Sequence, residues 1–321
     1  MSKITIQVSN RSDLNILKHS TFESTFHDTK NSLPISPLSE KTDEFFLVDD
    51  SVLERQEEDM LIFSSDDYSF LRITHGEKKY ENLENASYQA FKKIFDFMSE
   101  NTHLNFLRAW NYVPEILKIE GLERYREFNL GRWKSWEEHG PKFEDGKPMR
   151  PAMTAIGSLS DPLIVEALFT RHPVVYLENP RQKQFIDYSN KWGPKPPISA
   201  RGTLHLVPGS PEVFIAGTAS LLGEEVAHEG DIEEQVRETL RNIGALISKE
   251  NLLNYGHQQG FDLNDLQGIR AYIKNPETDF SRAQSILEKQ FPNKDILYLH
   301  DDICRPGFLI EIEAIARRGE L

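Results

Sequence analysis

Cysteine is almost absent from this chain, because only one of its 321 residues, Cys304, carries a thiol. A single cysteine can form neither an intrachain disulfide nor a cysteine-rich zinc site. Long apolar runs are absent as well, since no stretch approaches the roughly 20 apolar residues that span a bilayer. The opening residues, MSKITIQVSN, lack the charged and then apolar regions of a secretory signal. The sequence therefore predicts a cytoplasmic protein with no membrane partner.

Positive charge is also scarce. The chain has 37 Lys and Arg against 51 Asp and Glu, which gives a net charge of −14 at pH 7. Nucleic acids and anionic membranes are bound through a basic surface, so this balance argues against both partners. A small anionic substrate would need a local cluster of arginines. The hydrophobic content of 38% is that of an ordinary globular protein, and 321 residues suffice for one or two domains.

The signature motifs of metal and cofactor enzymes are missing. No Walker phosphate loop, dinucleotide glycine fingerprint or HExxH zinc motif occurs in the chain. The stretch GSLSD, at residues 157–161, contains a serine but lacks the G-x-S-x-G pattern of a nucleophile elbow. His228 and Glu229 have no further ligand at metal spacing, so His228 is more simply a loop histidine. The sequence predicts no metal site and no cofactor.

What the chain does contain is an internal repeat. In the second half, apolar residues recur at helical spacing over 231–249, and Asp231 is of a type that caps helix N-termini. The order helix, strand, helix, strand, strand is completed by segments 266–275, 279–291, 296–305 and 305–318. The first half shows the same order, in segments 87–100, 105–116, 121–140, 150–159 and 163–172. LRAWNYV in the first half echoes IRAYIKN in the second.

The repeat predicts two copies of one α+β unit, each with helices on one face of a sheet. We place the N-terminal unit at residues 1–195 and the C-terminal unit at 196–321. The Ser/Thr/Pro-rich stretch 16–45 is predicted to be an irregular surface segment. The stretch 190–202, with three prolines and two glycines, is predicted to connect the units.

The last predicted strand, within RPGFLIEIEAIARR, carries two carboxylates among apolar residues. Because successive strand residues point to opposite faces, one face reads as core: Ile310, Ile312, Ala314 and Ala316. The other face carries Leu309, Glu311, Glu313 and Ile315. Glutamates on such a strand are either solvated or chemically active.

Two sets of motifs resemble known families. GDIEEQVRETLRNIGALI and the final IEIEAIA strand resemble the RidA/YjgF family. Over most of the chain, blocks in the same order resemble the chorismatases, two-unit enzymes that release pyruvate from chorismate: FLRAWNYVPEI, LERYREFNLGR, PAMTAIG, ENPRQ, ARGT, AGTAS and ICRPGFLIEIEA. The resemblance implies two RidA/YjgF-like (chorismate-mutase-like) units with mixed sheets, helices packed on one face of each, and a cleft between the units as the site. We also expect a monomeric or weakly associating chain.

Chorismate carries two carboxylates, which arginine recognises through charge-assisted pairs of hydrogen bonds. A lone arginine is more often part of a surface ion pair. Arg201 and Arg305, however, stand beside apolar segments and match the family pattern. The substrate-binding residues implied by the resemblance are Arg201, Arg305, Tyr125, Arg132, Arg124 and Tyr112.

The resemblance gives Glu311 the role of catalytic acid. Cleavage of the enolpyruvyl ether needs a proton at the methylene carbon, a poor base, so the donor must stay protonated near neutral pH. Burial against apolar neighbours raises the pKa of a glutamic acid and would supply that property. Glu313 is expected to be solvated. Cys304, Gly217 and Gln182 match the branch of the family that forms hydroxybenzoate rather than the hydrolytic branch.

The sequence thus predicts a chorismatase that releases pyruvate and 3-hydroxybenzoate, with or without the 4-isomer. Chorismate has the same atoms as hydroxybenzoate plus pyruvate, so the net reaction needs no water and no redox partner. One alternative is the hydrolytic branch, which gives a dihydroxycyclohexadiene carboxylate. Others are an imine deaminase of the RidA type, which is usually a shorter chain, and a ligand-binding module without catalysis.

Overall fold

The computed structural model describes residues 5–7, 15–23, 32–142, 146, 149–159 and 161–318. Its helices are α1 (Glu77–Tyr80), α2 (Leu83–Glu100), α3 (Arg124–His139), α4 (Ile232–Ile247), α5 (Lys249–Leu253) and α6 (Pro276–Gln290). Short 3-10 turns are η1 (Phe185–Asp187), η2 (Asn190–Trp192) and η3 (Leu263–Asp265). None of these helices combines the length and apolar character needed to span a membrane.

The first unit is built on a six-stranded sheet with the order β12-β9-β13-β8-β7-β6. The strands are β6 (Leu53–Glu57), β7 (Met60–Ser64), β8 (Tyr68–His75), β9 (Asn105–Pro114), β12 (Ala152–Ser158) and β13 (Leu163–Thr170). Strands β9 and β12 run parallel, and the other neighbours are antiparallel. Helices α2 and α3 pack on each other, and apolar residues of both join the core of this sheet.

The second unit is built on a seven-stranded sheet with the order β14-β15-β16-β21-β19-β20-β4. The strands are β4 (Ser36–Pro37), β14 (Val174–Leu177), β15 (Gly202–His205), β16 (Glu212–Ala219), β19 (Leu266–Ile273), β20 (Ile296–His300) and β21 (Ile310–Arg317). Helices α4 and α6 cover one face. Asp231 caps α4 as expected, because its side chain accepts hydrogen bonds from the N–H groups of Glu233 and Glu234.

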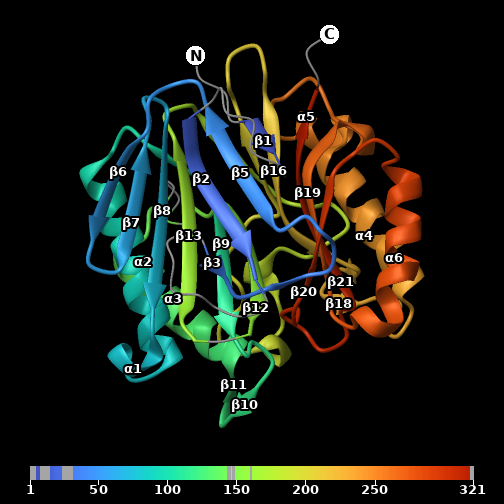
Figure 1. Ribbon diagram of the computed structural model, residues 1–321, viewed down its shortest axis with the longest axis horizontal. Helices are drawn as coiled ribbons and strands as arrows, with labels where there is room; N and C mark the ends of the chain where they lie inside the picture. The colour runs from blue at the N-terminus through green and yellow to red at the C-terminus, as the bar shows by residue number, and fades with distance from the viewer. Residues whose placement is uncertain are drawn as a thin grey trace.

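The two units connect and pair their strands in the same way. In each, a parallel pair of strands is joined through a helix, α3 between β9 and β12 and α6 between β19 and β20. In each, the next long strand, β13 or β21, then pairs antiparallel with the first strand of that pair. The predicted α+β class and the predicted repeat are therefore confirmed, and Figure 1 shows the two sheets side by side.

The prediction of an irregular surface segment at 16–45 is wrong for the residues that the structure describes. A four-stranded sheet, β1-β5-β2-β3, is formed by β1 (Thr5–Gln7), β2 (Asn15–Phe22), β3 (Ser32–Leu33) and β5 (Asp43–Val48). Leu17, Leu33 and Ile35 are fully buried. This sheet covers the sheet faces that the helices leave open, so its few apolar residues are needed inside. Residues 24–31 lie outside the described ranges.

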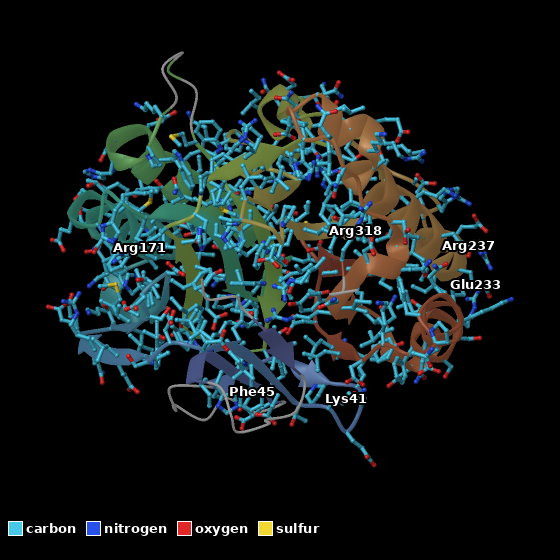
Figure 2. The ribbon with its side chains drawn as sticks, turned by 90° about the horizontal axis from the view of Figure 1, so that it is seen from above. Lys41, Phe45, Arg171, Glu233, Arg237 and Arg318 are labelled. Carbon is cyan, nitrogen blue, oxygen red and sulfur yellow. The ribbon has the colours of Figure 1, made fainter. Side chains whose placement is uncertain are left out.

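Figure 2 shows this arrangement from above, with Phe45 of β5 along one side of the molecule and Glu233 and Arg237 of α4 along another. The N-terminal strands share one core cluster with both main sheets, since Phe46 packs there with Trp110 of the first unit and Phe214 of the second. The two units are therefore held together by a common apolar layer.

The boundary predicted at residues 195 and 196 stays a prediction, and the sheets divide the chain at another place. Strand β14, which precedes residue 195, pairs with β15 of the second sheet. Strand β4, from the N-terminal part of the chain, hydrogen-bonds to β20 of the same sheet. Apart from β4, membership of the two main sheets therefore changes between β13 and β14.

The final strands are shorter than predicted. Strand β20 ends at His300 and β21 begins at Ile310, so residues 301–309 form a loop. Two successive aspartates and the Pro306–Gly307 pair are typical of loops and turns. The loop meets the edge of the first sheet, where Ile303 bridges to Ile156 of β12 and the N–H of Gly157 donates to the carbonyl of Asp302 at 2.8 Å. This loop carries Cys304 and Arg305 to the seam between the units.

Candidate active site

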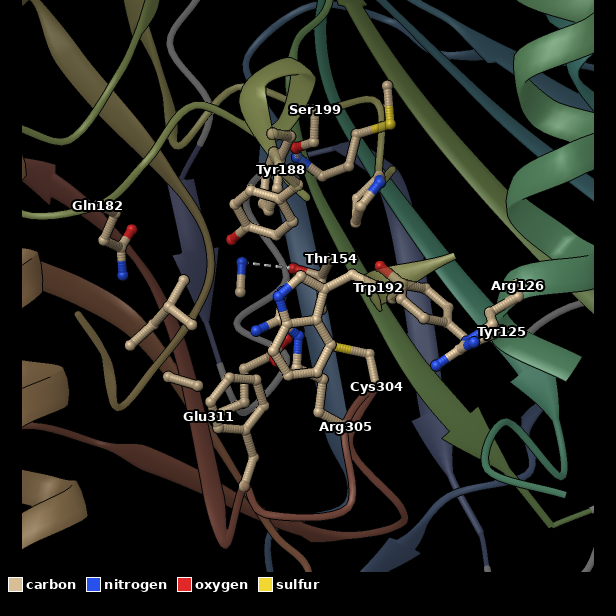
Figure 3. A pocket seen from close by; sticks show the side chains of 18 of the residues that line it. Tyr125, Arg126, Thr154, Gln182, Tyr188, Trp192, Ser199, Cys304, Arg305 and Glu311 are labelled. Carbon is tan, nitrogen blue, oxygen red and sulfur yellow. Dashed lines mark hydrogen bonds between the residues drawn. The ribbon is translucent and has the colours of Figure 1, made fainter. Parts of the chain in front are cut away.

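A cavity of about 270 Å³ lies at the seam between β12 of the first unit and β16 and β21 of the second. It collects eight of the ten site residues predicted from the sequence: Glu311, Cys304, Gly217, Gln182, Arg201, Arg305, Tyr125 and Arg132. In Figure 3, Glu311, Cys304 and Arg305 reach it from the second unit, and Tyr125 and Arg126 from the side of α3. Both units thus contribute to one site.

Glu311 is the buried acid of this cavity. Glu311 is only 4% exposed, and no donor in the described part of the chain forms a hydrogen bond with its carboxyl group. Burial, reinforced by the negative charge of Glu313, raises the pKa of Glu311 to about 8, while Arg108 and Arg201 act in the opposite direction. Glu311 is therefore largely protonated at neutral pH, as a proton donor to carbon must be.

The raised pKa predicts the pH dependence of turnover. If protonated Glu311 is the proton donor, as the family resemblance implies, kcat/KM should fall as the pH rises through about 8. The measurement is kcat/KM over the range of roughly pH 4 to 10. A profile that stays flat across this range, or that declines near the pKa of 4.5 of an ordinary glutamic acid, would contradict the assignment.

Gly217 leaves room for the acid. The register of β16 against β21 shifts between Ile215 and Thr218, so β16 carries a bulge at this point. A Cβ atom added to Gly217 would lie 1.9 Å from Oε1 of Glu311 and 3.0 Å from Cγ2 of Thr154. Any larger residue must therefore displace the Glu311 carboxyl group. The N–H of Gly217 donates to Oγ1 of Thr154 at 2.9 Å, which ties β16 to β12 beside the acid.

The expectation that Glu313 is solvated is wrong. Glu313 is 4% exposed, and Arg270, Tyr272 and Trp110 donate to its Oε1 at 2.8, 3.1 and 3.2 Å. Arg108 and Thr154 donate to its other oxygen. This face of the strand packs against β9 and β12 of the first unit rather than facing water. Glu313 is thus a buried ion-pair partner and cannot serve as a solvated control for Glu311.

The first unit holds a counterpart of Glu311. Trp110, which corresponds to Tyr272 in the repeated motif, pairs across the ladder with Glu166, as Tyr272 pairs with Glu311. Glu166 is fully buried, with Nζ of Lys18 at 3.5 Å and Nε of Arg72 at 2.8 Å. Burial alone would raise the pKa of Glu166, but the charges of Lys18 and Arg72 outweigh it and lower the pKa. The counterpart is ionised where Glu311 is neutral.

Three buried arginines line the cavity without a carboxylate partner. Arg132, Arg201 and Arg305 are 1%, 6% and 7% exposed, and no Asp or Glu in the described part of the chain forms an ion pair with them. Elsewhere in the interior, buried arginines do pair with carboxylates: Arg72, Arg108, Arg270 and Arg317. Burying an uncompensated charge is costly, so this group fits a site that receives an anionic ligand.

Neutral groups hold these guanidinium groups in place. Arg132 donates to Oδ1 of Asn129 at 2.6 Å, and burial lowers its pKa to about 10. Arg201 donates to the hydroxyl of Tyr188 at 2.9 Å and to a backbone carbonyl. Arg305 donates to the carbonyl of Glu224 at 2.8 Å. The hydrogen bonds fix the side chains but leave their charge for a ligand.

Two predicted substrate-binding residues lie outside the cavity, which corrects the sequence-based assignment. Nε of Arg124 donates to the carbonyl of Pro114 at 2.7 Å, so its side chain turns back toward the end of β9. Tyr125 and Arg132, seven positions apart, share the face of α3 that meets the cavity, and Arg124 is one position off that face. Tyr112 is buried on β9, with its hydroxyl 3.3 Å from Arg270.

Cys304 and Gln182 also line the cavity, and their role in selecting the product stays a prediction. Burial raises the pKa of the Cys304 thiol to about 12, so it stays protonated and acts as a small apolar wall rather than as a nucleophile. Nε2 of Gln182 is buried and has no hydrogen-bond partner in the part of the chain that the structure describes. An unpaired buried donor of this kind suits a ligand oxygen.

Sequence reasoning missed the aromatic residues that close the cavity. Phe185, Tyr188 and Trp192 come from η1, η2 and the residues between them, in the stretch FIDYSNKW. Aromatic side chains in a polar, turn-rich connection are a signal that could have been noticed. Within the described ranges, no group of three or more His, Cys, Asp or Glu side chains could hold a metal ion.

Comparisons with known proteins bear on this geometry. The chain is 35% identical over 240 residues to a 3-hydroxybenzoate synthase of Streptomyces hygroscopicus, which covers 72% of this chain and 68% of that protein. It is 32% identical over 228 residues to a chorismatase of Streptomyces rapamycinicus, which covers 69% of this chain and 67% of that protein. A RutC family protein of Pyrococcus horikoshii is 31% identical over 109 residues, 32% of this chain and 77% of that protein.

Family and structure comparisons agree with these relatives. The family model described as "Chorismatase FkbO/Hyg5-like, N-terminal" matches residues 44–169. A crystal structure of a chorismatase superimposes with a TM-score of 0.86, at 24% sequence identity, over 98% of each chain, and so has the same fold. With relatives matched at more than 30% identity over two thirds of their length, the chain belongs to the chorismatase family.

Proposed function

We propose that this protein converts chorismate to pyruvate and 3-hydroxybenzoate. The observation that supports this most directly is the combination inside one cavity of a carboxylic acid with a raised pKa and arginines without carboxylate partners. The acid is Glu311, and the arginines are Arg132, Arg201 and Arg305. Chorismate suits both, because it carries two carboxylates and an enolpyruvyl ether that protonation at carbon activates for cleavage.

Binding and proton transfer divide between these groups. Arg201 and Arg305, from the second unit, and Arg132, from α3, would bind the substrate carboxylates through charge-assisted hydrogen bonds. Glu311 would then donate its proton to the methylene carbon of the enolpyruvyl group. The low exposure of the cavity wall keeps Glu311 protonated at the pH at which the arginines are charged. Acid and cations can therefore act together without neutralising each other.

The later steps balance without a further reactant. After protonation, the ether oxygen attacks the ring as the 4-hydroxyl group leaves and adds to the cationic carbon of the side chain. Release of pyruvate frees the proton of that hydroxyl group, which restores the acid form of Glu311, and a ring C–H proton moves to the phenol oxygen as the ring becomes aromatic. The leaving hydroxyl supplies the oxygen of the pyruvate carbonyl, so the atoms of chorismate equal those of the two products. No oxidant, reductant or added water enters the sum.

The aromatic product is favoured over the hydrolytic one by two observations. The relative that is 35% identical to this chain is named a 3-hydroxybenzoate synthase. Gly217, Cys304 and Gln182, the residues assigned to the aromatising branch, line the same cavity as Glu311. The hydrolytic reaction is the second candidate, because other relatives bear only the name chorismatase.

Product analysis tests the proposal. The purified protein is mixed with chorismate, with and without EDTA, and the products are separated by chromatography. We expect equal amounts of pyruvate and 3-hydroxybenzoate, with no effect of EDTA. A dihydroxycyclohexadiene carboxylate would identify the hydrolytic reaction instead. Binding without turnover would identify a ligand-binding protein, and a requirement for metal would overturn the cofactor-free reaction.

Substitution of Gly217 should change the product. A Cβ atom at this position meets Oε1 of Glu311, so Gly217→Ala moves the acid and narrows the space beside the ring. We expect slower turnover and a shift from hydroxybenzoate toward the hydrolysed diene, and Cys304→Val should shift the ratio in the same direction. The product ratio is read by chromatography.

A matched control is available on α4. Gly244 is helical, and an added Cβ there meets nothing within 4 Å, so Gly244→Ala should leave both rate and product unchanged. If Gly217→Ala and Cys304→Val both make only hydroxybenzoate at the wild-type rate, these positions do not select the product.

A further inference from the structure

A single connecting segment contacts two of the arginines that line the cavity. Residues 183–192, which we call the aromatic strap, run between β14 and β15 and include η1 and η2. The strap supplies three aromatic side chains to the cavity wall: Phe185, Tyr188 and Trp192. Figure 3 shows Tyr188 and Trp192 at the same cavity as Glu311 and Arg305.

Arg201 is held by the strap on three sides. Its guanidinium carbon lies 3.7 Å from the centre of the Phe185 ring, which is close stacking. Its Nη2 donates to the Tyr188 hydroxyl at 2.9 Å and to the backbone carbonyl of Lys183 at 2.8 Å. Its Nε is buried without a hydrogen-bond partner in the described ranges, so this donor remains for a ligand.

Arg305 is held in the same manner at the other end of the strap. Its guanidinium carbon lies 3.6 Å from the centre of the Trp192 ring and 5.0 Å from that of Tyr188. Tyr188 therefore stands between the two arginines and contacts both. A cation over an aromatic face is attracted to it, more strongly where water is excluded.

The groups of the strap that contact the two arginines are all neutral: ring faces, a hydroxyl group and a backbone carbonyl. Their neutrality indicates their role. A carboxylate in their place would fix the arginines equally well but would cancel the charge that must attract the substrate. A ring face, a hydroxyl group and a carbonyl orient a guanidinium without neutralising it. We propose that Phe185, Tyr188 and Trp192 are positioning residues that hold Arg201 and Arg305 in place for the substrate carboxylates, an inference that rests on the proposed function.

The strap itself is fixed to both units, so it can transmit a definite geometry. The N–H of Ser189 donates to a carboxylate oxygen of Glu224 at 2.7 Å, in the hairpin of β17 (Leu221–Leu222) and β18 (Glu225–Val226) of the second unit. Arg126 of α3, in the first unit, donates to the carbonyl of Lys191 at 3.2 Å. The rings are thus held across the seam over the cavity.

The test separates binding from turnover. Chorismate is titrated calorimetrically into the Glu311→Gln variant, in which turnover is blocked, with and without Trp192→Leu or Phe185→Leu. Leucine keeps an apolar side chain but removes the ring face, so each change should raise Kd by about 3- to 30-fold. Trp192→Phe, which restores a ring, should bring Kd back to within about threefold of the parent.

Steady-state kinetics in the presence of Glu311 supply a second readout. Trp192→Leu should raise KM by a similar factor, while kcat stays within about threefold and the alkaline limb of the pH profile does not move. Lys195→Met is the control, because the Lys195 amine lies over a ring outside the strap, that of Trp133, at 4.9 Å, and is exposed and pairs with Glu137. Its loss should leave Kd within about twofold.

The outcomes distinguish the two ideas. If the wild-type protein turns over chorismate but both leucine variants bind it as tightly as their parent, the strap does not position the arginines. A loss of kcat with unchanged Kd would likewise overturn the inference. If the wild-type protein binds chorismate without converting it, and the leucine variants weaken binding, the proposed function fails and the inference holds. Absence of any chorismate binding overturns both.

Discussion

Replacing Glu311 by glutamine should lower kcat by about 10²–10⁴-fold while chorismate still binds. Glutamine preserves the size and the hydrogen-bonding shape of the protonated acid but cannot donate a proton to carbon. Binding should persist because the substrate carboxylates are held by arginines rather than by Glu311. Steady-state kinetics give kcat, and calorimetric titration with chorismate gives Kd for the same preparation.

The stability of the Glu311→Gln variant is its control. Burial raises the pKa of Glu311 from 4.5 to about 8, so the folded protein keeps this proton where the unfolded chain has lost it. By linkage, this group makes the folded state less stable as the pH rises from about 4.5 to about 8. The variant should therefore melt at the wild-type temperature or above it at alkaline pH. Normal turnover, or a melting temperature lowered in step with the rate, would contradict the role of Glu311 as an acid.

Replacing Glu313 by glutamine should have the opposite signature, a loss of about 3–5 kcal/mol in the free energy of unfolding. Glu313 is the carboxylate that pairs with Arg108, and it also accepts from Arg270. Glutamine removes the negative charge and leaves the Arg108 guanidinium, 2% exposed, in the interior without its counter-ion. Urea denaturation, followed by the midpoint and slope of the transition, measures the loss.

The control for this change is an exposed ion pair. Glu115 pairs with Lys118 at 2.8 Å, and its side chain is 54% exposed, so Glu115→Gln should unfold at nearly the wild-type urea concentration. If Glu313→Gln also unfolds there, the buried ion pairs do not support the seam. The Glu311→Gln variant should lose activity and the Glu313→Gln variant should lose stability. The two glutamates lie only two positions apart on one strand, so the pair distinguishes a catalytic effect from a structural one.

The sequence predicted the elements with local signals. Helix α4 follows from the spacing of its apolar residues and from Asp231, and β21 follows from alternation, which correctly placed Ile310 and Ile312 in the core. The repeat was visible because both copies end in a buried apolar strand. Glu311 was found through its family resemblance, and the raised pKa gives that assignment a physical reason.

Other features depend on which segments meet in space. The apolar residues of 16–45 are too scattered to show a period, yet Leu17 and Ile35 are fully buried because this segment covers the open faces of both sheets. Glu313 is likewise buried by contacts with a distant segment, here β9 and β12 of the first unit, which an alternation pattern cannot show. Arg124 and Arg132 look alike in sequence, and only the orientation of α3 sends Arg132 to the cavity.

Glu166 and Glu311 occupy equivalent positions in the two copies of the repeat but differ in protonation state. The same ladder position holds a carboxyl group in each copy, but in the first copy Lys18 arrives from the N-terminal sheet and, with Arg72, ties that group into a permanent ion pair. In the second copy no cation in the described ranges forms an ion pair with Glu311, and an open space remains beside it. In the proposed reaction, the second copy would supply the acid, whereas the carboxylate of the first copy only stabilises the fold. The carboxyl group available for proton transfer is thus the one that has no cationic partner to keep it ionised.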